Sequence, residues 1–393
     1  MAEPFDVIVL GSGPGGYVAA ERAAQLGMRT ALVEKDELGG VCLNWGCIPT
    51  KALLESAHAW GVLQDAGKYG LGCDNPSVDF AAVIARSRSI ADRMSKGVGF
   101  LMKRRGVTVI KGTGSLKNRS GAPDSIWTVT VDPGNGAAPE DVNGRHVILA
   151  TGGRPMALPG TPFDGERVLH STHAMSLTRQ PRSIIIIGAG AIGREFASFY
   201  RRIGTDVTVI EMMPQVLPNE DAGIVNELNR SLRRQKITVM TDSRVTAVDL
   251  SGNDVRVTAA TAKGDRTVSA EKLIMAIGVR ANSENLGLET AGVTVDRGFV
   301  PVDDRGRTSV PGIYAIGDLT GPPLLAHKAS AQALVCVDTI AGIDTHPVNF
   351  DHIPGCTYCD PQVASVGLTE AAARDRGIDV KTGTFPFRAN GRS

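Results

Sequence analysis

The chain has 393 residues, of which 42% are hydrophobic and 21% charged, and its formal net charge is +1. That length exceeds one ordinary domain core, so two or three globular domains are expected. A near-neutral charge without any run of 18 apolar residues excludes a polybasic nucleic-acid binder and a helical membrane protein. Met1 leads directly into the strand-like FDVIVL, without the flanks of a signal peptide, which predicts a cytoplasmic protein.

The first predicted unit, residues 5–34, has the order strand, glycine turn, helix, strand. Gly11 permits a tight turn, Gly13 lets the backbone approach a pyrophosphate, and Gly16 allows the helix to pack closely on the strand. Glu34 ends the second strand, where a carboxylate accepts a hydrogen bond from a ribose hydroxyl. The complete order, more than the glycines alone, predicts a dinucleotide site.

The next stretch, GGVCLNWGCIPTK (39–51), places Cys42 and Cys47 five residues apart. In a regular helix their Cα atoms would lie about 8–9 Å apart, which is outside disulfide range. Gly46 and Pro49 interrupt such a helix, and a bridge in so small a ring would be readily reducible. Zinc ligands usually have shorter spacing, so a redox pair is favoured, while core packing stays open.

A second unit with the same order covers residues 183–211. Gly188, Gly190 and Gly193 form its turn, and Glu211 ends its second strand. The residues after Glu211 are methionines rather than arginines, so the carboxylate would repel a 2′-phosphate and no adjacent cation would hold it. This second site is expected to prefer NAD over NADP.

Three further segments, 146–153, 272–280 and 312–321, are predicted apolar strands that are each followed by glycine. Such strand ends are typical of the edge of a sheet where a ligand binds. Asp318 follows one such strand end, where it accepts from a sugar or ribityl hydroxyl or caps the next turn. The alternating stretch 118–144 predicts an inserted antiparallel sheet.

These features predict an α/β protein with two dinucleotide-binding, Rossmann-like domains. The first domain is expected at 1–149 and 281–349, with the second, 150–280, inserted in it, and a partial α+β segment at 350–393. The remaining cysteines are expected to be packing residues, so no metal site is predicted; they are Cys73, Cys336, Cys356 and Cys359.

Twin nucleotide units with C-x4-C directly after the first resemble the pyridine nucleotide–disulfide oxidoreductases. Within that family the stretch GGVCLNWGCIPTKAL is most like the dihydrolipoamide dehydrogenase branch. The segments AIGVRAN, GIYAIGD, LLAHKA and DPQVASVGLTE agree with the family in the expected order, so the resemblance covers essentially the whole chain.

The resemblance implies two cofactors, one in each unit. FAD is expected in the first unit, at Gly11, Gly13, Gly16, Glu34, Lys51, Gly114, Thr151, Asp318 and Ala326. NAD is expected in the second unit, at Gly188, Gly190, Gly193, Glu211, Val245 and Gly278.

The resemblance also implies catalytic roles. Cys42 is expected to be the interchange thiol that exchanges with the substrate sulfur, and Cys47 the thiol beside the flavin, where its thiolate forms a charge-transfer complex. Lys51 is expected near the flavin N5, paired with Glu195. A cation there would stabilise reduced flavin and the Cys47 thiolate, and the carboxylate would compensate the buried ammonium.

The family's general base, a histidine near the C-terminus that acts across a dimer, has no counterpart among the seven histidines. His346 in THPVNFD has a similar local sequence but precedes the interface segment. The final segment is therefore expected to be the first part of an interface domain, in a chain that binds FAD and NAD, retains diaphorase-type activity, and dimerises and turns over dihydrolipoamide poorly.

The expected reaction is oxidation of protein-bound dihydrolipoamide with reduction of NAD. The expected partners are lipoyl domains of a 2-oxo acid dehydrogenase complex core or a glycine cleavage system, and a second copy of the full-length chain. The alternatives are a related FAD-dependent reductase of another disulfide or of a metal substrate, or a form with diaphorase activity only.

Overall fold

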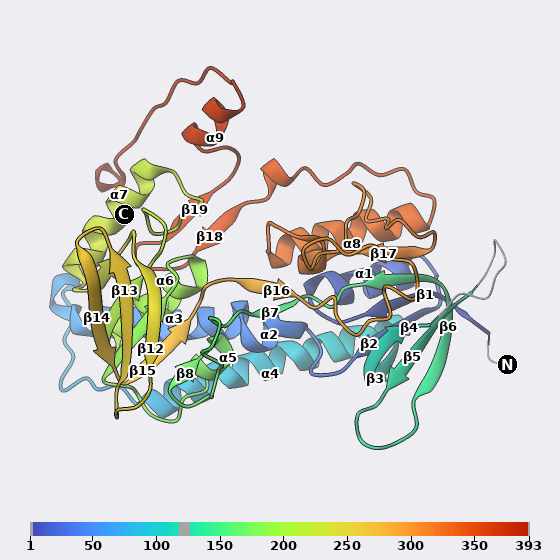
Figure 1. The fold of residues 1–393 in the computed structure, drawn as a ribbon, viewed down its shortest axis with the longest axis horizontal. Coiled ribbons are helices and arrows are strands. Elements are labelled where there is room, and N and C mark those ends of the chain that lie inside the picture. The colour runs from blue at the N-terminus through green and yellow to red at the C-terminus, as the bar shows by residue number, and fades with distance from the viewer. Residues whose placement is uncertain (1–2, 118–125, 392–393) are drawn as a thin grey trace.

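The computed structural model describes residues 3–117 and 126–391, which form an elongated molecule with two sheet-centred lobes (Figure 1). One lobe is built on the first sheet, and the other on a second parallel sheet with a small antiparallel sheet beside it. No helix in these described ranges is long and apolar enough to cross a bilayer.

The first sheet begins with the strand that precedes the first glycine turn. Its order is β3 (Thr108–Lys111), β2 (Thr30–Glu34), β1 (Phe5–Leu10), β6 (Glu140–Leu149), β5 (Trp127–Asp132) and β4 (Thr113–Leu116), and β17 (Ile313–Ala315) also pairs with β6. The pairs β1–β2, β2–β3, β1–β6 and β6–β17 are parallel, whereas β4–β5 and β5–β6 are antiparallel. The parallel core confirms the predicted α/β class.

Strand β6 belongs to both parts of this sheet. Its first half pairs antiparallel with β5, and its second half pairs parallel with β1, the change occurring at Gly144. The antiparallel sheet predicted at 118–144 is therefore continuous with the parallel sheet rather than a separate insertion. Residues 118–125 of that prediction lie outside the described residues.

Alternating side chains of β1 build two cores on the two faces of the first sheet. Val7 and Val9 pack with α1 (Pro14–Gln25), α4 (Phe80–Arg105) and α8 (Ala326–Ile340). Ile8 and Leu10 pack with the antiparallel strands and with residues 281–300. The period of two in a strand explains why one short segment serves both layers.

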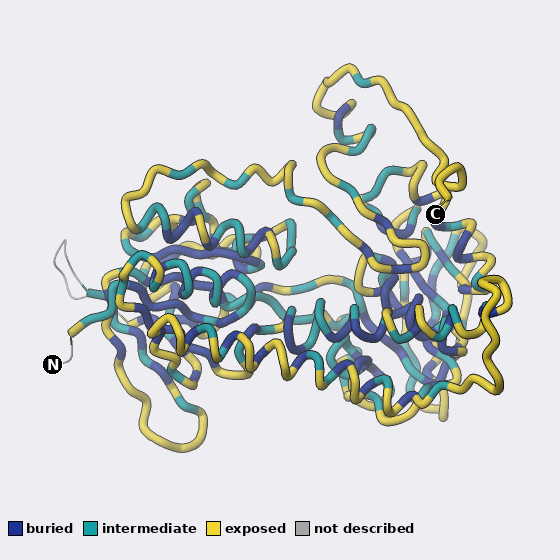
Figure 2. The backbone as a smooth tube through the Cα atoms, turned by 180° about the vertical axis from the view of Figure 1, so that it is seen from behind, coloured by how far each residue is buried: buried dark blue, intermediate teal, exposed yellow. Residues whose placement is uncertain are grey.

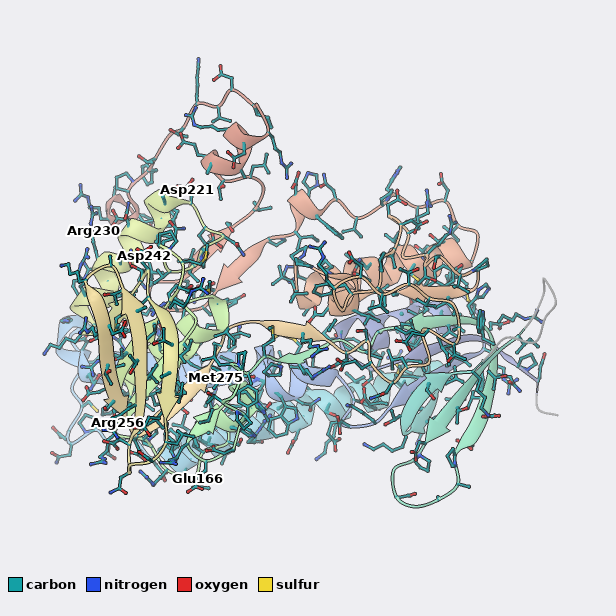
Figure 3. All side chains as sticks on the ribbon, in the orientation of Figure 1. Glu166, Asp221, Arg230, Asp242, Arg256 and Met275 are labelled. Atoms are coloured by element: carbon teal, nitrogen blue, oxygen red, sulfur yellow. A yellow bond between two sulfur atoms is a disulfide. The ribbon has the colours of Figure 1, made fainter. Side chains whose placement is uncertain are left out.

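The second sheet is wholly parallel. Its order is β11 (Thr238–Met240), β10 (Asp206–Ile210), β9 (Ser183–Ile187), β15 (Lys272–Met275) and β8 (Val168–Leu169). One face packs on α3 (Cys47–Gln64), α6 (Ala191–Arg202) and α7 (Ala222–Arg234). The other face packs on the antiparallel strands β12 (Arg244–Asp249), β13 (Val255–Thr261) and β14 (Gly264–Ala270). Met275 of β15, labelled in Figure 3, belongs to this core.

Two features join the lobes. The chain passes between them through an antiparallel pair, β7 (Gly153–Pro155) and β16 (Val279–Ala281), which lies between the lobes in Figure 1. Helix α3 starts beside α2 (Gly40–Trp45) and packs into the core of the second sheet. These crossings fall close to the boundaries expected at 149 and 281, although the division into domains stays a prediction.

The C-terminal segment lies against the second lobe. It contains η3 (Phe350–His352), β18 (Gly355–Thr357), β19 (Val363–Ser365), α9 (Glu370–Asp375) and η4 (Phe387–Ala389); the short elements η1 (Ala66–Tyr69) and α5 (Ser171–Ala174) lie earlier in the chain. The hairpin β18–β19 contacts α6, whereas residues 366–391 are mostly exposed (Figure 2).

Two of the four cysteines outside C-x4-C are not packing residues, contrary to the prediction. Cys73 and Cys356 are exposed, whereas Cys336 and Cys359 are buried. Cys73 lies in an irregular stretch after η1, and Cys356 points outward from the short hairpin β18–β19. Apolar neighbours in the sequence do not ensure that a cysteine is buried, because only one face of such a short element is covered by the rest of the protein.

Candidate active site between two glycine turns

The first glycine turn joins β1 to α1 and leaves no room for a side chain at Gly16. A Cβ there would lie 1.8 Å from the Gly11 carbonyl oxygen, and Gly11 itself has φ +96°. A Cβ on Gly13 would meet nothing within 4 Å, so the backbone at the start of α1 faces open space. Close packing beside open space at a helix N-terminus fits the pyrophosphate of a dinucleotide such as FAD.

Glu34 is held at the end of β2, beside this turn. One carboxylate oxygen accepts from the Ser12 backbone N–H at 2.8 Å and from the Ser12 hydroxyl at 2.6 Å. The other accepts from the Asp36 N–H at 2.8 Å. Because a carboxylate oxygen has two acceptor sites, this second oxygen retains one for a ribose hydroxyl.

The second glycine turn, between β9 and α6, repeats the first. A Cβ on Gly193 would lie 2.0 Å from the Gly188 carbonyl oxygen, Gly188 has φ +100°, and a Cβ on Gly190 would meet nothing within 4 Å. The residues present therefore fit a second dinucleotide at the N-terminus of α6.

Glu211 ends β10 as Glu34 ends β2. Its carboxylate accepts from the Ala189 N–H at 2.6 Å and from the Met213 N–H at 2.8 Å. Met212 and Met213 are exposed beside it. The carboxylate is thus fixed where an adenosine ribose would lie, with apolar side chains next to it.

A disulfide joins the two cysteines at the junction of α2 and α3. The helix is interrupted at Gly46, and this brings the Cα atoms of Cys42 and Cys47 to 4.7 Å. Both cysteines are only partly buried. The bridge is therefore accessible to a substrate thiol, as disulfide exchange requires.

One turn after Cys47, helix α3 carries Lys51. Its Nζ lies 2.9 Å from both carboxylate oxygens of Glu195, on the first turns of α6. The Glu195 side chain is 6% exposed and that of Lys51 is 35% exposed. A bidentate pair thus joins the helix that bears the disulfide to the helix that bears the second glycine turn.

Asp318 lies in η2 (Gly317–Thr320), directly after β17. Burial raises the pKa of its carboxyl group, and the nearby Lys328 opposes that rise. Lys328 is fully buried, and its Nζ donates to the carbonyl oxygens of Gly317 at 2.8 Å and Gly321 at 2.9 Å. Desolvation lowers the pKa of Lys328 to about 8, against the attraction of Asp318.

The other residues implied by the resemblance are dispersed around this centre. Gly114 lies in β4, where a Cβ would come within 2.8 Å of Leu10, and the Thr151 hydroxyl donates to the Asn282 carbonyl oxygen at 2.8 Å. The others are Ala326, the first residue of α8, Val245 in β12, and Gly278, with φ +135°, before β16. They lie on both sides of the crossing between the lobes.

Sequence reasoning missed three residues around the pairs described above. Lys328 lies inside LLAHKA without a role of its own in the sequence analysis, and Tyr358, which contacts both members of the Lys51–Glu195 pair, lies two residues before the start of DPQVASVGLTE. Arg194 is fully buried beside Glu195. A charged residue inside a largely apolar helical stretch is the sequence signal that could have identified Arg194 and Lys328.

His346 is exposed in the loop between α8 and η3. Within residues 3–117 and 126–391, no group of three His, Cys, Asp or Glu side chains is arranged to hold a metal ion.

Two family models match the chain. One, described as pyridine nucleotide-disulphide oxidoreductase, covers residues 5–333, and the dimerisation domain of the same family covers residues 353–393.

Curated relatives match over the whole chain. A dihydrolipoyl dehydrogenase of Rhizobium etli is 46% identical over 100% of this chain and 84% of its own length. A dihydrolipoyl dehydrogenase of Bacillus subtilis is 40% identical over 100% of this chain and 83% of its own length.

Solved structures share the fold. The crystal structure of LpdA from Mycobacterium tuberculosis has a TM-score of 0.91 and 29% identity, covering 98% of this chain and 83% of that one. The HOCl-induced flavoprotein disulfide reductase RclA from Escherichia coli has a TM-score of 0.83 and 25% identity, covering 98% of this chain and 83% of that one.

Proposed function

We propose that this chain, which belongs to the pyridine nucleotide-disulphide oxidoreductase family, is a flavoprotein that oxidises dihydrolipoyl groups to lipoyl groups and reduces NAD. The observation that carries the proposal is the Cys42–Cys47 disulfide one helical turn from the Lys51–Glu195 pair, between two glycine turns that each fit a dinucleotide. Relatives that are 40–46% identical over the whole chain bear the name of this activity.

The cysteines carry the exchange with substrate. A substrate thiolate attacks the Cys42 sulfur, the Cys42–Cys47 bond breaks, and the bonding electron pair leaves on Cys47 as a thiolate. The second substrate thiol then gives its proton to solvent, and its thiolate attacks the substrate sulfur of the mixed disulfide, which releases Cys42 as a thiolate. The substrate leaves as a cyclic disulfide, and the cysteine pair holds its two electrons.

In the next step, the transfer of electrons from the cysteine pair to NAD, the residues of this chain would bind the two cofactors and stabilise charge. Bound FAD would supply the two-electron chemistry that links the cysteine pair to NAD. The first glycine turn, Glu34 and Asp318 would hold FAD. Lys51 would stabilise negative charge beside Cys47, and Glu195 keeps that ammonium compensated.

The second glycine turn and Glu211 would hold NAD rather than NADP. The carboxylate is fixed by two backbone N–H groups, so it cannot turn away from a 2′-phosphate, and the exposed neighbours are methionines.

The partners that suit this reaction are lipoyl domains and a second copy of the chain. The match to the family's dimerisation domain supports a homodimer. The dihydrolipoyl groups would come from a 2-oxo acid dehydrogenase complex or a glycine cleavage system. A cytoplasmic location stays a prediction.

Steady-state assays of the FAD-loaded protein test the proposal. We expect slow NAD reduction with dihydrolipoamide, because none of the seven histidines matches the family's general base, and still less NADH oxidation with glutathione disulfide, mercuric ion or cupric ion. Cys47→Ser should abolish the dihydrolipoamide reaction, and Cys73→Ser, which changes an exposed thiol outside the bridge, should leave it intact. Turnover of glutathione disulfide or of a metal ion in preference to dihydrolipoamide would favour the alternative reductases.

A further inference from the structure

The Lys51–Glu195 pair has a third member from the C-terminal segment. The backbone N–H of Tyr358 donates to the Glu195 Oε1 atom at 3.0 Å, and the Lys51 Nζ lies 4.8 Å from the centroid of the Tyr358 ring. One residue therefore contacts both charges, from a hairpin that is remote in sequence from α3 and α6.

Both contacts fix the positions of the Lys51 ammonium and the Glu195 carboxylate. A cation over an aromatic face is attracted by the ring quadrupole, and an N–H donor stabilises a carboxylate. Glu195 receives donors from Lys51 on both oxygens and from Tyr358 on one, so its carboxylate has little freedom to turn. The Lys51 side chain is 35% exposed, and the ring of Tyr358 limits where its ammonium can move.

The backbone at Tyr358 is fixed in place by contacts of the neighbouring residues rather than by packing of the Tyr358 ring. Cys359 is 3% exposed in the core of the second lobe. The Asp360 N–H donates to the Ser198 hydroxyl at 3.3 Å, and the Gln235 side chain donates to the Asp360 carbonyl oxygen at 2.6 Å. Further along, the Glu370 N–H donates at 3.3 Å to Asp221, the residue directly before α7 that Figure 3 labels. Tyr358 itself is 41% exposed, so the segment stays anchored by its neighbours when the ring is removed.

We infer that Tyr358 is a positioning residue for Lys51: its ring face and its backbone N–H together fix the ammonium and carboxylate beside the reacting thiol and cofactor. The inference rests on the proposed function for its catalytic consequence, and the geometry of the three residues stands without it. The C-terminal segment thereby contributes to the centre built by the first and second units.

The first test uses the protein without cofactor. An amine-reactive acylating reagent is applied, and labelling of Lys51 is measured by peptide mass spectrometry relative to Lys68, whose side chain is 75% exposed. Tyr358→Leu should raise the labelling of Lys51 several-fold, and Tyr358→Phe, which keeps the ring, should not. Tyr358→Met is a second variant without a ring, so the result does not depend on the folding of one protein.

The second test uses the FAD-loaded protein. Loss of the ring should shift the midpoint potential of the bound flavin to a more negative value and slow its reduction by NADH about 2- to 30-fold, the range expected for loss of a cation–π contact. Tyr358→Phe should restore both values. A merely structural effect would lower thermal stability, but the flavin potential and the reduction rate would not differ between Tyr358→Leu and Tyr358→Phe.

The outcomes separate this inference from the proposed function. Unchanged Lys51 labelling and flavin potential in both variants without a ring, or equal changes in Tyr358→Phe and Tyr358→Leu, would overturn the inference. A wild-type protein that does not oxidise dihydrolipoamide would contradict the proposed function, whereas the Lys51 labelling would still decide the role of Tyr358.

Discussion

Replacing Arg194 with methionine should make the protein more stable. Arg194 is fully buried on α6, and none of its three guanidinium nitrogens has a hydrogen-bond partner within the described ranges. Burial lowers its pKa from 12.5 to about 10, although the nearby Cys359 opposes this effect. A buried charge without an acceptor destabilises the folded state, whereas methionine fills similar space without a charge.

The size of the gain follows from the pKa. One pKa unit corresponds to 1.36 kcal/mol, so the drop from 12.5 to about 10 corresponds to roughly 3 kcal/mol of destabilisation. Because the folded-state pKa lies below the unfolded value, the full penalty applies below about pH 10 and disappears as the pH rises from there towards 12.5. At neutral pH the variant should gain about 1–3 kcal/mol, the lower values allowing for imperfect packing.

Urea unfolding at pH 7, followed by tryptophan fluorescence, measures this gain. Arg93→Met is the matched control, because Arg93 is exposed in the middle of helix α4, where its charge is solvated. The control should change the free energy of unfolding by less than about 0.5 kcal/mol. A loss of stability in Arg194→Met, with the control unchanged, would refute the reasoning, since it would require an acceptor that outweighs the desolvation.

Other predictions concern the cofactor sites. Gly16→Ala should lower the stability of the protein without cofactor by roughly 1–3 kcal/mol through its clash, whereas Gly13→Ala should leave that stability unchanged and weaken FAD binding, as thermal melts and flavin titrations would reveal. In stopped-flow experiments NADH should reduce the flavin more than about tenfold faster than NADPH, because Glu211 repels a 2′-phosphate; equal rates would contradict this. Lys328→Met should leave buried carbonyl groups without a donor, at roughly 1–3 kcal/mol each, and speed FAD release measured by flavin fluorescence; unchanged release would remove Lys328 from this role.

The two glycine turns were predictable because their geometry is local. Gly16 and Gly193 each face a carbonyl oxygen five residues earlier, and no residue with a Cβ fits there. The fold class followed from the same local order of strand, turn and helix. The break in the helix between the cysteines was also predictable. A disulfide between residues five apart cannot form in a regular helix, and Gly46 lies between them where the break occurs.

The surroundings of the site could not be predicted in the same way. Tyr358 contacts Lys51 and Glu195 only because the hairpin β18–β19 packs on α6. The local sequence of neither element predicts that the two pack together. The exposure of Cys73 was mispredicted for a related reason, because burial depends on which segments cover a residue and not on its neighbours in sequence. The contacts of Tyr358 and the exposure of Cys73 therefore depend on packing between segments distant in sequence, which local patterns do not predict.

The absorption spectrum of the FAD-loaded protein, reduced anaerobically with dihydrolipoamide, tests the central claim most directly. The wild type and the control Cys73→Ser should develop a long-wavelength thiolate–flavin charge-transfer band. Cys42→Ser, which leaves the Cys47 thiol free, should have that band without any substrate, and Cys47→Ser should lack it under all conditions. Indistinguishable spectra for Cys42→Ser and Cys47→Ser, or full flavin reduction by dihydrolipoamide in Cys47→Ser, would contradict the account.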